Sequence, residues 1–174
     1  MTTPDPNVCP QCGGRKKPEF ELCPNCNRER RDSRRGDRAR RALELPSKCI
    51  FETFYVDETS IKPEVFVDAA KKAAEVFGSA SMTRTSTRAL FNMLKPMDRR
   101  MRIKPDLNVN EVNECFYKFL NVVDDKVRRK VMPNIFRDFV YSHKDVVKDN
   151  KKEFRGFVRY LTSILIYLPD KGRG

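Results

Sequence analysis

Hydrophobic residues recur at helical spacing through most of the chain beyond residue 46. The most regular of these patterns begins near Asn150, where apolar residues follow one face of a helix. A helix that starts there should bury this face in the protein core. The residues of the face are Phe154, Phe157, Val158, Leu161, Ile164, Leu165 and Leu168.

Two helices are predicted earlier in the chain. The first should begin at Pro63 and end at Gly78, which favours termination. The second should run from Thr83 to about Arg102, and Pro96 should kink or split it because proline lacks a backbone N–H. The face of the first helix that we expect to be buried consists of Val65, Phe66, Ala69, Ala73, Val76 and Phe77.

Two more helices are predicted between these and the last one. Asn108 and Glu111 are spaced as in a capping box, with Asn as the cap. The helix that follows should bury Val112, Cys115, Phe116, Phe119, Leu120 and Val123. A further helix should start around Pro133 and bury Ile135, Phe136, Phe139 and Val140.

The predicted fold class is all-α, a compact bundle of about five helices over residues 46–174. A strand pattern appears only in a cysteine-rich hairpin near the N-terminus and, weakly, in the run CIFETFYV. We expect three regions along the chain: a small four-cysteine zinc ribbon at 1–30, an arginine-rich linker at 31–45, and the helical bundle at 46–174.

The four cysteines of the first region form two C-x-x-C pairs, CPQC and CPNC, with ten residues between them. This spacing favours a hairpin that closes a tetrahedral all-sulfur site. Gly13 and Asn27 follow the two pairs and tolerate the positive φ angle of a tight turn. The ligands that we expect are Cys9, Cys12, Cys23 and Cys26.

We expect these cysteines to hold one structural zinc ion. The alternative is two disulfides, which would require an oxidising compartment. The opening MTTPDPNV has no apolar stretch that could act as a signal peptide, so a cytoplasmic location is expected. A site closed by four cysteines has no open position for a substrate, which favours a structural or recognition role.

The chain is strongly basic, with 36 Lys and Arg against 24 Asp and Glu and a formal charge of +12. This charge favours a polyanionic partner, above all nucleic acid, although acidic proteins and anionic lipids also bind basic proteins. Residues 28–41 carry eight arginines and three acids, which suits either a solvated tether or an arm that contacts phosphates. No apolar run approaches the roughly 18 residues of a membrane span.

Cationic residues of the second predicted helix fall within about 60° of one another on a helical wheel. They could contact a phosphate backbone or form an ordinary solvated face. A smaller pair lies one turn apart on the polar side of the last helix. The candidate contacts are Arg84, Arg88, Lys95, Arg99 and Arg102 in the former, and Arg155 and Arg159 in the latter.

The sequence contains no recognisable catalytic set, so we expect no enzymatic activity from this chain alone. Its single histidine, His143, should lie at the surface or in the last turn of a helix. Asp124 and Asp125 are adjacent and do not share a helix face, which argues against a metal dyad. No phosphate-binding glycine loop, nucleophile elbow or zinc-protease motif is present.

Two segments, TRTSTRALFNML and EFRGFVRYLTSILIYLPDKGRG, together resemble the small helical subunit of the type III-A CRISPR effector, the Csm complex. The resemblance covers roughly residues 46–174. It implies a prokaryotic, cytoplasmic and non-catalytic subunit that stacks as repeated copies along backbone subunits in antiviral defence. Such subunits line the channel of the guide RNA–target RNA duplex and contact RNA without reading its sequence.

Within this resemblance, Arg88 corresponds to the arginine of the family motif, and Arg84 belongs with it. The other candidate contacts depend on the helical wheel alone. The zinc ribbon and the arginine-rich linker are not part of the usual small subunit. The alternative function is a stand-alone zinc-ribbon nucleic-acid-binding regulator or a ribosome-associated factor.

Overall fold

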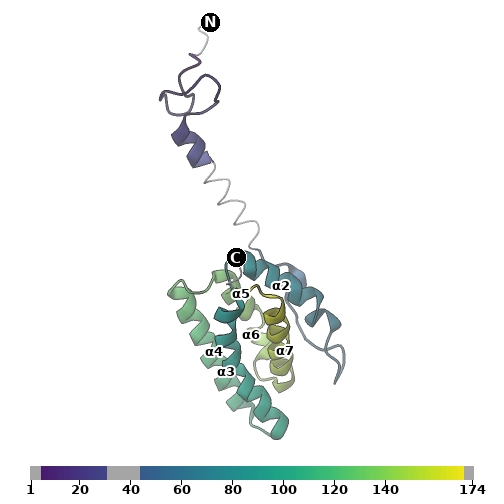
Figure 1. The fold of residues 1–174 in the computed structure, drawn as a ribbon. Coiled ribbons are helices and arrows are strands. Elements are labelled where there is room, and N and C mark those ends of the chain that lie inside the picture. The colour runs from purple at the N-terminus through teal and green to yellow at the C-terminus, as the bar shows by residue number, and fades with distance from the viewer. Residues whose placement is uncertain (1–4, 31–43, 171–174) are drawn as a thin grey trace. The chain divides into compact units, whose positions relative to one another are not determined.

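The computed structural model describes residues 5–30 and 44–170. These residues fall into two compact units, one with the four cysteines and one with helices α2 to α7, and each is described by itself (Figure 1). The arginine-rich linker predicted at 31–45 lies, except for its last two residues, outside the described residues.

The second unit is all-α, as predicted. No β-strand forms in residues 5–30 or 44–170, where pairing is limited to isolated bridges between Val8 and Arg15 and between Tyr55 and Ile61. The run CIFETFYV is therefore not a strand. The helices are α2 (Asp68–Ser79), α3 (Arg84–Ile103), α4 (Val109–Arg128), α5 (Asn134–Ser142), α6 (Lys144–Val147) and α7 (Lys151–Tyr167), with 3-10 turns η1 (Ser47–Cys49) and η2 (Pro63–Val65).

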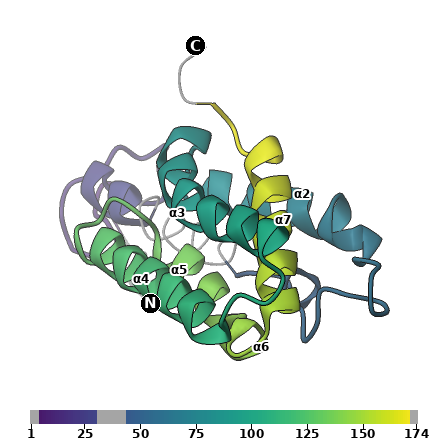
Figure 2. The same ribbon diagram turned by 90° about the horizontal axis from the view of Figure 1, so that it is seen from below.

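Helix α7 is central to this unit. It packs against α2 on one side and against α3 on the other, and α4 packs against α3 (Figure 2). Every residue of its predicted apolar face is buried. The core around α7 is largely aromatic and contains Phe54, Phe77, Phe116, Phe119, Phe136, Phe139, Phe154, Phe157 and Tyr160.

Residues 49–54, which precede α2, are held against α7 by hydrogen bonds. The Glu153 carboxylate accepts hydrogen bonds from the Phe54 N–H at 2.8 Å and from the Thr53 hydroxyl at 2.6 Å. The Tyr160 hydroxyl donates to the Cys49 carbonyl at 3.1 Å. These contacts fix the segment that continues into residues 55–61, which thereby comes to lie beside the first turn of α7.

The helix predicted from Pro63 is interrupted. The 3-10 turn η2 ends after Val65, and Val67 adopts non-helical angles (φ −123°, ψ −80°) before α2 begins at Asp68. This break keeps Val65 and Ala69 in the core and turns Phe66 outward, so the prediction that Phe66 is buried was wrong. Helix α2 also continues past Gly78 to Ser79.

Helix α3 starts at a capping box in which the Thr83 hydroxyl accepts from the Ser86 N–H and the Ser86 hydroxyl accepts from the Thr83 N–H. Pro96 lies inside α3 without splitting it. Since proline cannot donate, the Asn92 carbonyl one turn earlier lacks its helical partner. This carbonyl belongs to the same surface as several candidate contacts.

The prediction that Asn108 caps a helix is confirmed, because its side chain accepts from the Asn110 N–H at 2.9 Å at the start of α4. Asn150, where the sequence predicted only the start of a helix, also caps α7 by accepting from the Lys152 and Glu153 N–H groups. Glu111 does not complete the predicted capping box, because its carboxylate pairs with Arg100 at 2.7 Å.

His143 is fully buried at the C-terminal end of α5, so the prediction of a surface position was wrong and that of a helix end was right. Its Nε2 accepts from the Phe51 N–H at 3.2 Å, and its Nδ1 lies 2.8 Å from the Phe139 carbonyl. The ring stacks on Phe54. His143 follows Phe136, Phe139 and Val140 at helical spacing, so periodicity along α5 already indicated a buried position for it.

Candidate metal centre and candidate nucleic-acid interface

The sulfur atoms of Cys9, Cys12, Cys23 and Cys26 lie within 4.8 Å of one another. Tetrahedral coordination with metal–sulfur bonds of about 2.3 Å places thiolates about 3.8 Å apart, so the cluster fits a single ion. All four cysteines are free thiols, and the Cys12 and Cys23 sulfurs are 3.5 Å apart, far beyond a disulfide bond of about 2.05 Å. These cysteines could therefore hold a metal ion.

The two cysteine pairs are presented by different local structures. Gly13 adopts φ +70°, as predicted for a tight turn, and its N–H donates to the Cys9 carbonyl at 2.9 Å. Asn27 does not adopt a positive φ, so that prediction was wrong. It lies in the helical stretch at 24–30, where its N–H donates to the Cys23 carbonyl at 3.0 Å.

Hydrogen bonds, thiol–thiol contacts and burial give these cysteines different pKa values. The Cys23 N–H, 3.4 Å from the Cys9 sulfur, is the main cause that lowers the pKa of Cys9 to about 6. The Cys26 N–H likewise lowers the pKa of Cys23. The pKa of Cys26 is raised, first by its contact with the Cys12 thiol and then by burial. A bound cation would allow all four sulfurs to ionise together.

Several candidate nucleic-acid contacts line a groove of about 550 Å³ on α3. These contacts are Lys95, Arg99 and Arg102, and the rest of the lining consists of Asn92, Pro96 and Asp98. The Lys95 ammonium lies 5.9 Å from the centre of the Phe91 ring, and Lys95 and Arg99 are both exposed. The predicted wheel therefore describes one continuous cationic surface along the second half of α3.

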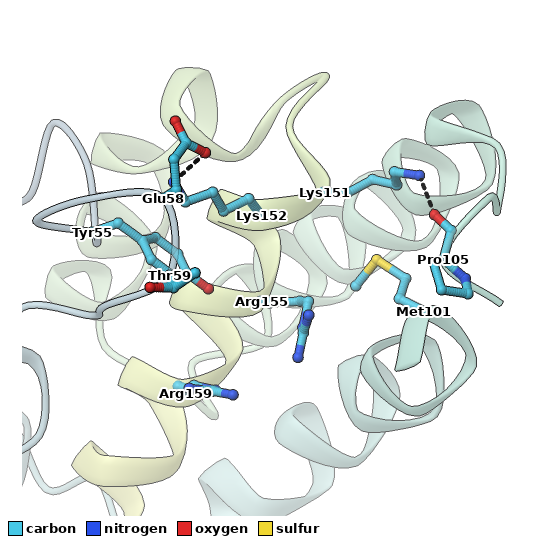
Figure 3. Close-up of a pocket in the computed structure, with 9 residues that line it drawn as sticks. All are labelled: Tyr55, Glu58, Thr59, Met101, Pro105, Lys151, Lys152, Arg155 and Arg159. Carbon is cyan, nitrogen blue, oxygen red and sulfur yellow. Dashed lines mark hydrogen bonds and ion pairs between the residues drawn. The ribbon is translucent and has the colours of Figure 1, made fainter. Parts of the chain in front are cut away.

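A second cavity, of about 370 Å³, lies between the first turns of α7, the end of α3 and the loop at 55–59. Figure 3 shows Arg155 and Arg159 projecting into it from the same side of α7. Burial raises the pKa of Tyr55 in its wall, and the charges of Arg159 and Arg155 oppose that rise. Positive charge therefore reaches across this cavity.

Asp98 joins the groove on α3 to the cavity on α7. Its side chain is only 5% exposed and forms an ion pair with Arg102, one turn later on α3. The other carboxylate oxygen lies 3.5 Å from the Arg155 Nε, at a geometry that leaves both atoms without a hydrogen bond within the described part of the chain. The structure thus brings together Arg102 and Arg155, which are far apart in sequence.

Arg84 has a different position from the rest of the predicted stripe. Its guanidinium donates to the carbonyls of Leu165, Ile166 and Leu168 at 3.0 to 3.2 Å and pairs with Asp170 at 2.8 Å. These are the unsatisfied carbonyls at the end of α7, so Arg84 caps that helix. Most of its donors are occupied inside the protein.

Arg102 and Arg155 share Asp98, whereas the other four candidates have no such partner. In residues 5–30 and 44–170, the side chains of Arg88, Lys95, Arg99 and Arg159 form no ion pair and no hydrogen bond. We call these four residues, with Arg102 and Arg155, the basic face. It follows α3 and the first half of α7, and Asp98 is its buried acid.

Sequence reasoning missed Asp98, Lys151 and Lys152. Lys151 donates to the carbonyls of Pro105 and Leu107, and Lys152 lies over the Tyr55 ring and pairs with Glu58 at 3.5 Å (Figure 3). Lys151 could have been found from its spacing, since residues 151, 155 and 159 follow one helix face at intervals of four.

Asp124 and Asp125 form ion pairs with neighbouring arginines on the surface of the helical unit. Asp124 accepts from Arg137 at 2.7 Å and from the Tyr141 hydroxyl at 2.6 Å, which lowers the pKa of Asp124. Asp125 pairs with Arg128 at 2.7 Å and with Arg129 at 3.5 Å. These arginines thus differ from Arg88, Arg99 and Arg159 of the basic face, whose side chains have no ion-pair partner among the described residues.

Among the described residues, every helix is too short or too polar to cross a membrane. No family model, curated protein or solved structure matches this chain.

Proposed function

We propose that this protein is a non-catalytic RNA-binding subunit that holds the RNA backbone on the basic face of α3 and α7. The observation that carries the proposal is the junction at Asp98, where cations of two packed helices form one surface. Exposed guanidinium and ammonium groups without internal partners are the groups that bind phosphates and release counterions.

The proposal for a larger assembly is based on the resemblance to the small helical subunit of the type III-A CRISPR effector. The segment TRTSTRALFNML forms the cap and the first half of α3, and EFRGFVRYLTSILIY forms most of α7. The two segments therefore belong to the helices that pack together and carry the basic face. This supports the proposal that the chain is the small subunit of a type III CRISPR ribonucleoprotein, with guide and target RNA, backbone subunits and further copies of itself as partners.

The four-cysteine unit is proposed to bind one structural zinc ion. Four convergent thiols fit zinc, which in structural sites takes four ligands in tetrahedral geometry. The apolar core of the described residues 5–30 consists of Cys9, Cys23 and Cys26 with Leu22 packed against them, which is too little to fold without such a cross-link. Zinc would supply the cross-link that holds the two cysteine turns together.

RNA binding to the basic face is tested by removing three cations that lack internal partners. The variant Lys95→Ala/Arg99→Ala/Arg159→Ala should bind unrelated RNA sequences more weakly and lower the slope of log K against log salt by about 2. The matched control, Lys118→Ala/Arg128→Ala/Arg129→Ala, removes the same charge from exposed positions on α4 that have acidic neighbours. An equal loss in both variants would show that only net charge matters.

The assembly is tested separately. A tagged copy of the chain, purified from its host at low salt, should carry processed guide RNA and larger partner subunits. An RNA-free monomer would contradict the CRISPR assignment and favour the stand-alone regulator, whatever the result for the basic face.

A further inference from the structure

The four-cysteine unit has a cavity of about 450 Å³ that neither the metal site nor the basic face uses. Its wall combines cationic, aromatic and amide side chains over an apolar floor. The lining residues are Arg15, Lys16, Lys17, Phe20, Leu22, Pro24 and Asn27.

Phe20 is the aromatic residue of this wall, and it is 52% exposed to solvent. Its backbone position is fixed, since the Phe20 N–H donates to the Lys17 carbonyl at 3.0 Å and the Lys16 ammonium donates to the Phe20 carbonyl at 2.9 Å. A large aromatic ring held at a cavity rim offers a flat face on which a planar group can stack.

Three other polar side chains of the cavity, those of Asn27, Arg15 and Lys17, are available to a ligand. Asn27 is half-buried, and no hydrogen bond of its side-chain amide occurs within residues 5–30 or 44–170. An amide offers both a donor and an acceptor. Arg15 forms no ion pair in the same residues, whereas Lys17 has only a loose contact with Glu19 at 3.9 Å between exposed side chains.

We propose that this cavity binds an unpaired nucleotide of single-stranded RNA. The base would stack on Phe20 and present its edge to the Asn27 amide, while Arg15 and Lys17 would contact the flanking phosphates. Single-stranded RNA is bound in this way by an aromatic platform, an edge-reading polar group and nearby cations. An acidic peptide would satisfy the cations but would leave the ring and the amide without planar partners.

The proposal is independent of the basic face, and the test keeps the two apart. In the full chain carrying Lys95→Ala/Arg99→Ala/Arg159→Ala, a short fluorescent single-stranded RNA should still bind, and a duplex of the same sequence should bind more weakly. Adding Phe20→Ala should weaken single-strand binding at least about fivefold, and adding Phe20→Tyr should preserve it. Adding Asn27→Ala should weaken it less and change the preference among bases.

The matched control is Phe66→Ala, which removes another exposed phenylalanine from the helical unit and should leave binding unchanged. Metal content is measured for every variant, so that loss of the ring is separated from loss of the cysteine site. Photo-cross-linking with 4-thiouridine should attach RNA within residues 15–27. Equal affinities of the Phe20→Ala variant and its parent, or cross-links confined to residues 44–170, would overturn the proposal.

Discussion

Gly156, in the middle of α7, lies directly against Phe54. A Cβ at residue 156 would lie 2.5 Å from the Phe54 Cβ and 2.9 Å from its Cγ, both closer than van der Waals contact allows. Phe54 is fully buried, and its backbone N–H is bound by Glu153 on the same helix. The glycine therefore allows the segment before α2 to pack onto α7.

Replacing Gly156 by alanine should destabilise the protein. An exposed helical glycine gains about 1 kcal/mol on this change, but here the methyl group must displace buried Phe54. Overpacking of this kind costs typically about 1–3 kcal/mol, so we expect net destabilisation in urea unfolding. Gly78→Ala is the control, because its Cβ would meet only the Pro169 ring at 3.3 Å. Equal stability of both variants would contradict the close packing.

The protein should become less stable as the pH is lowered, because His143 is buried in its neutral form. Burial lowers the pKa of His143 from 6.5 to about 4, with a smaller opposing effect from the Phe139 carbonyl. The unfolded chain therefore binds a proton between these pH values that the folded chain excludes. The stabilisation is complete above pH 6.5, declines as pH falls toward about 4, and amounts to about 3 kcal/mol.

Urea unfolding of the wild type and of His143→Gln over this pH range measures the effect. The variant should be less stable at neutral pH but should lack the decline in the upper part of the range, since the chain has no other histidine. Hydrogen bonds from Thr59 and Ser60 lower the pKa of Asp57 to about 2. The contribution of such acidic groups to the stability of the fold is lost only at lower pH. Parallel pH profiles for the two proteins would contradict a neutral buried His143.

The elements that sequence predicted well are those specified by local patterns. The apolar face of α7, the Asn108 cap and the C-x-x-C spacing each depend on residues a few positions apart. The failures have different causes. Arg84 is occupied by carbonyls 81 to 84 residues away, a contact that a helical wheel does not describe. Phe66 turns outward because of a local break at Val67. His143 lies on the buried face of α5, and its hydrogen bond from Phe51, 92 residues away, explains how a polar ring is accommodated there.

Arg84 and Arg88 should therefore behave differently, although both lie on the same predicted stripe. Arg84→Ala removes hydrogen bonds from the end of α7 and should cost about 1–3 kcal/mol of stability with little effect on RNA affinity. Arg88→Ala removes an exposed charge and should weaken RNA binding without changing the unfolding midpoint. Thermal unfolding and fluorescence anisotropy of both variants test this, and a loss of affinity confined to Arg84→Ala would contradict it.

Metal removal should affect one unit alone. Each chain should contain about one zinc ion, released by a strong chelator and lost in Cys9→Ser. The helical signal in far-UV circular dichroism should largely remain, because helices α2 to α7 belong to the unit without the cysteines. Cys115→Ser is the control, as this half-buried thiol contacts the Met93 carbonyl and lies outside the cluster. Two disulfides in the purified protein would refute the zinc site.

Asp98→Asn should change stability and RNA binding in opposite directions. The carboxylate is buried between Arg102 and Arg155, whose side chains are 59% and 35% exposed, so solvent screens part of their attraction. We expect a loss of about 1–2 kcal/mol in urea unfolding, below the cost of breaking a fully buried pair. RNA affinity should rise, because the change to an amide removes the negative charge between Arg102 and Arg155 and frees both guanidinium groups for phosphate. Asp125→Asn, which releases Arg128 and Arg129 on α4, is the matched control and should leave affinity unchanged. If affinity falls in Asp98→Asn while the fold is retained, Asp98 orients the arginines for RNA instead of competing with it.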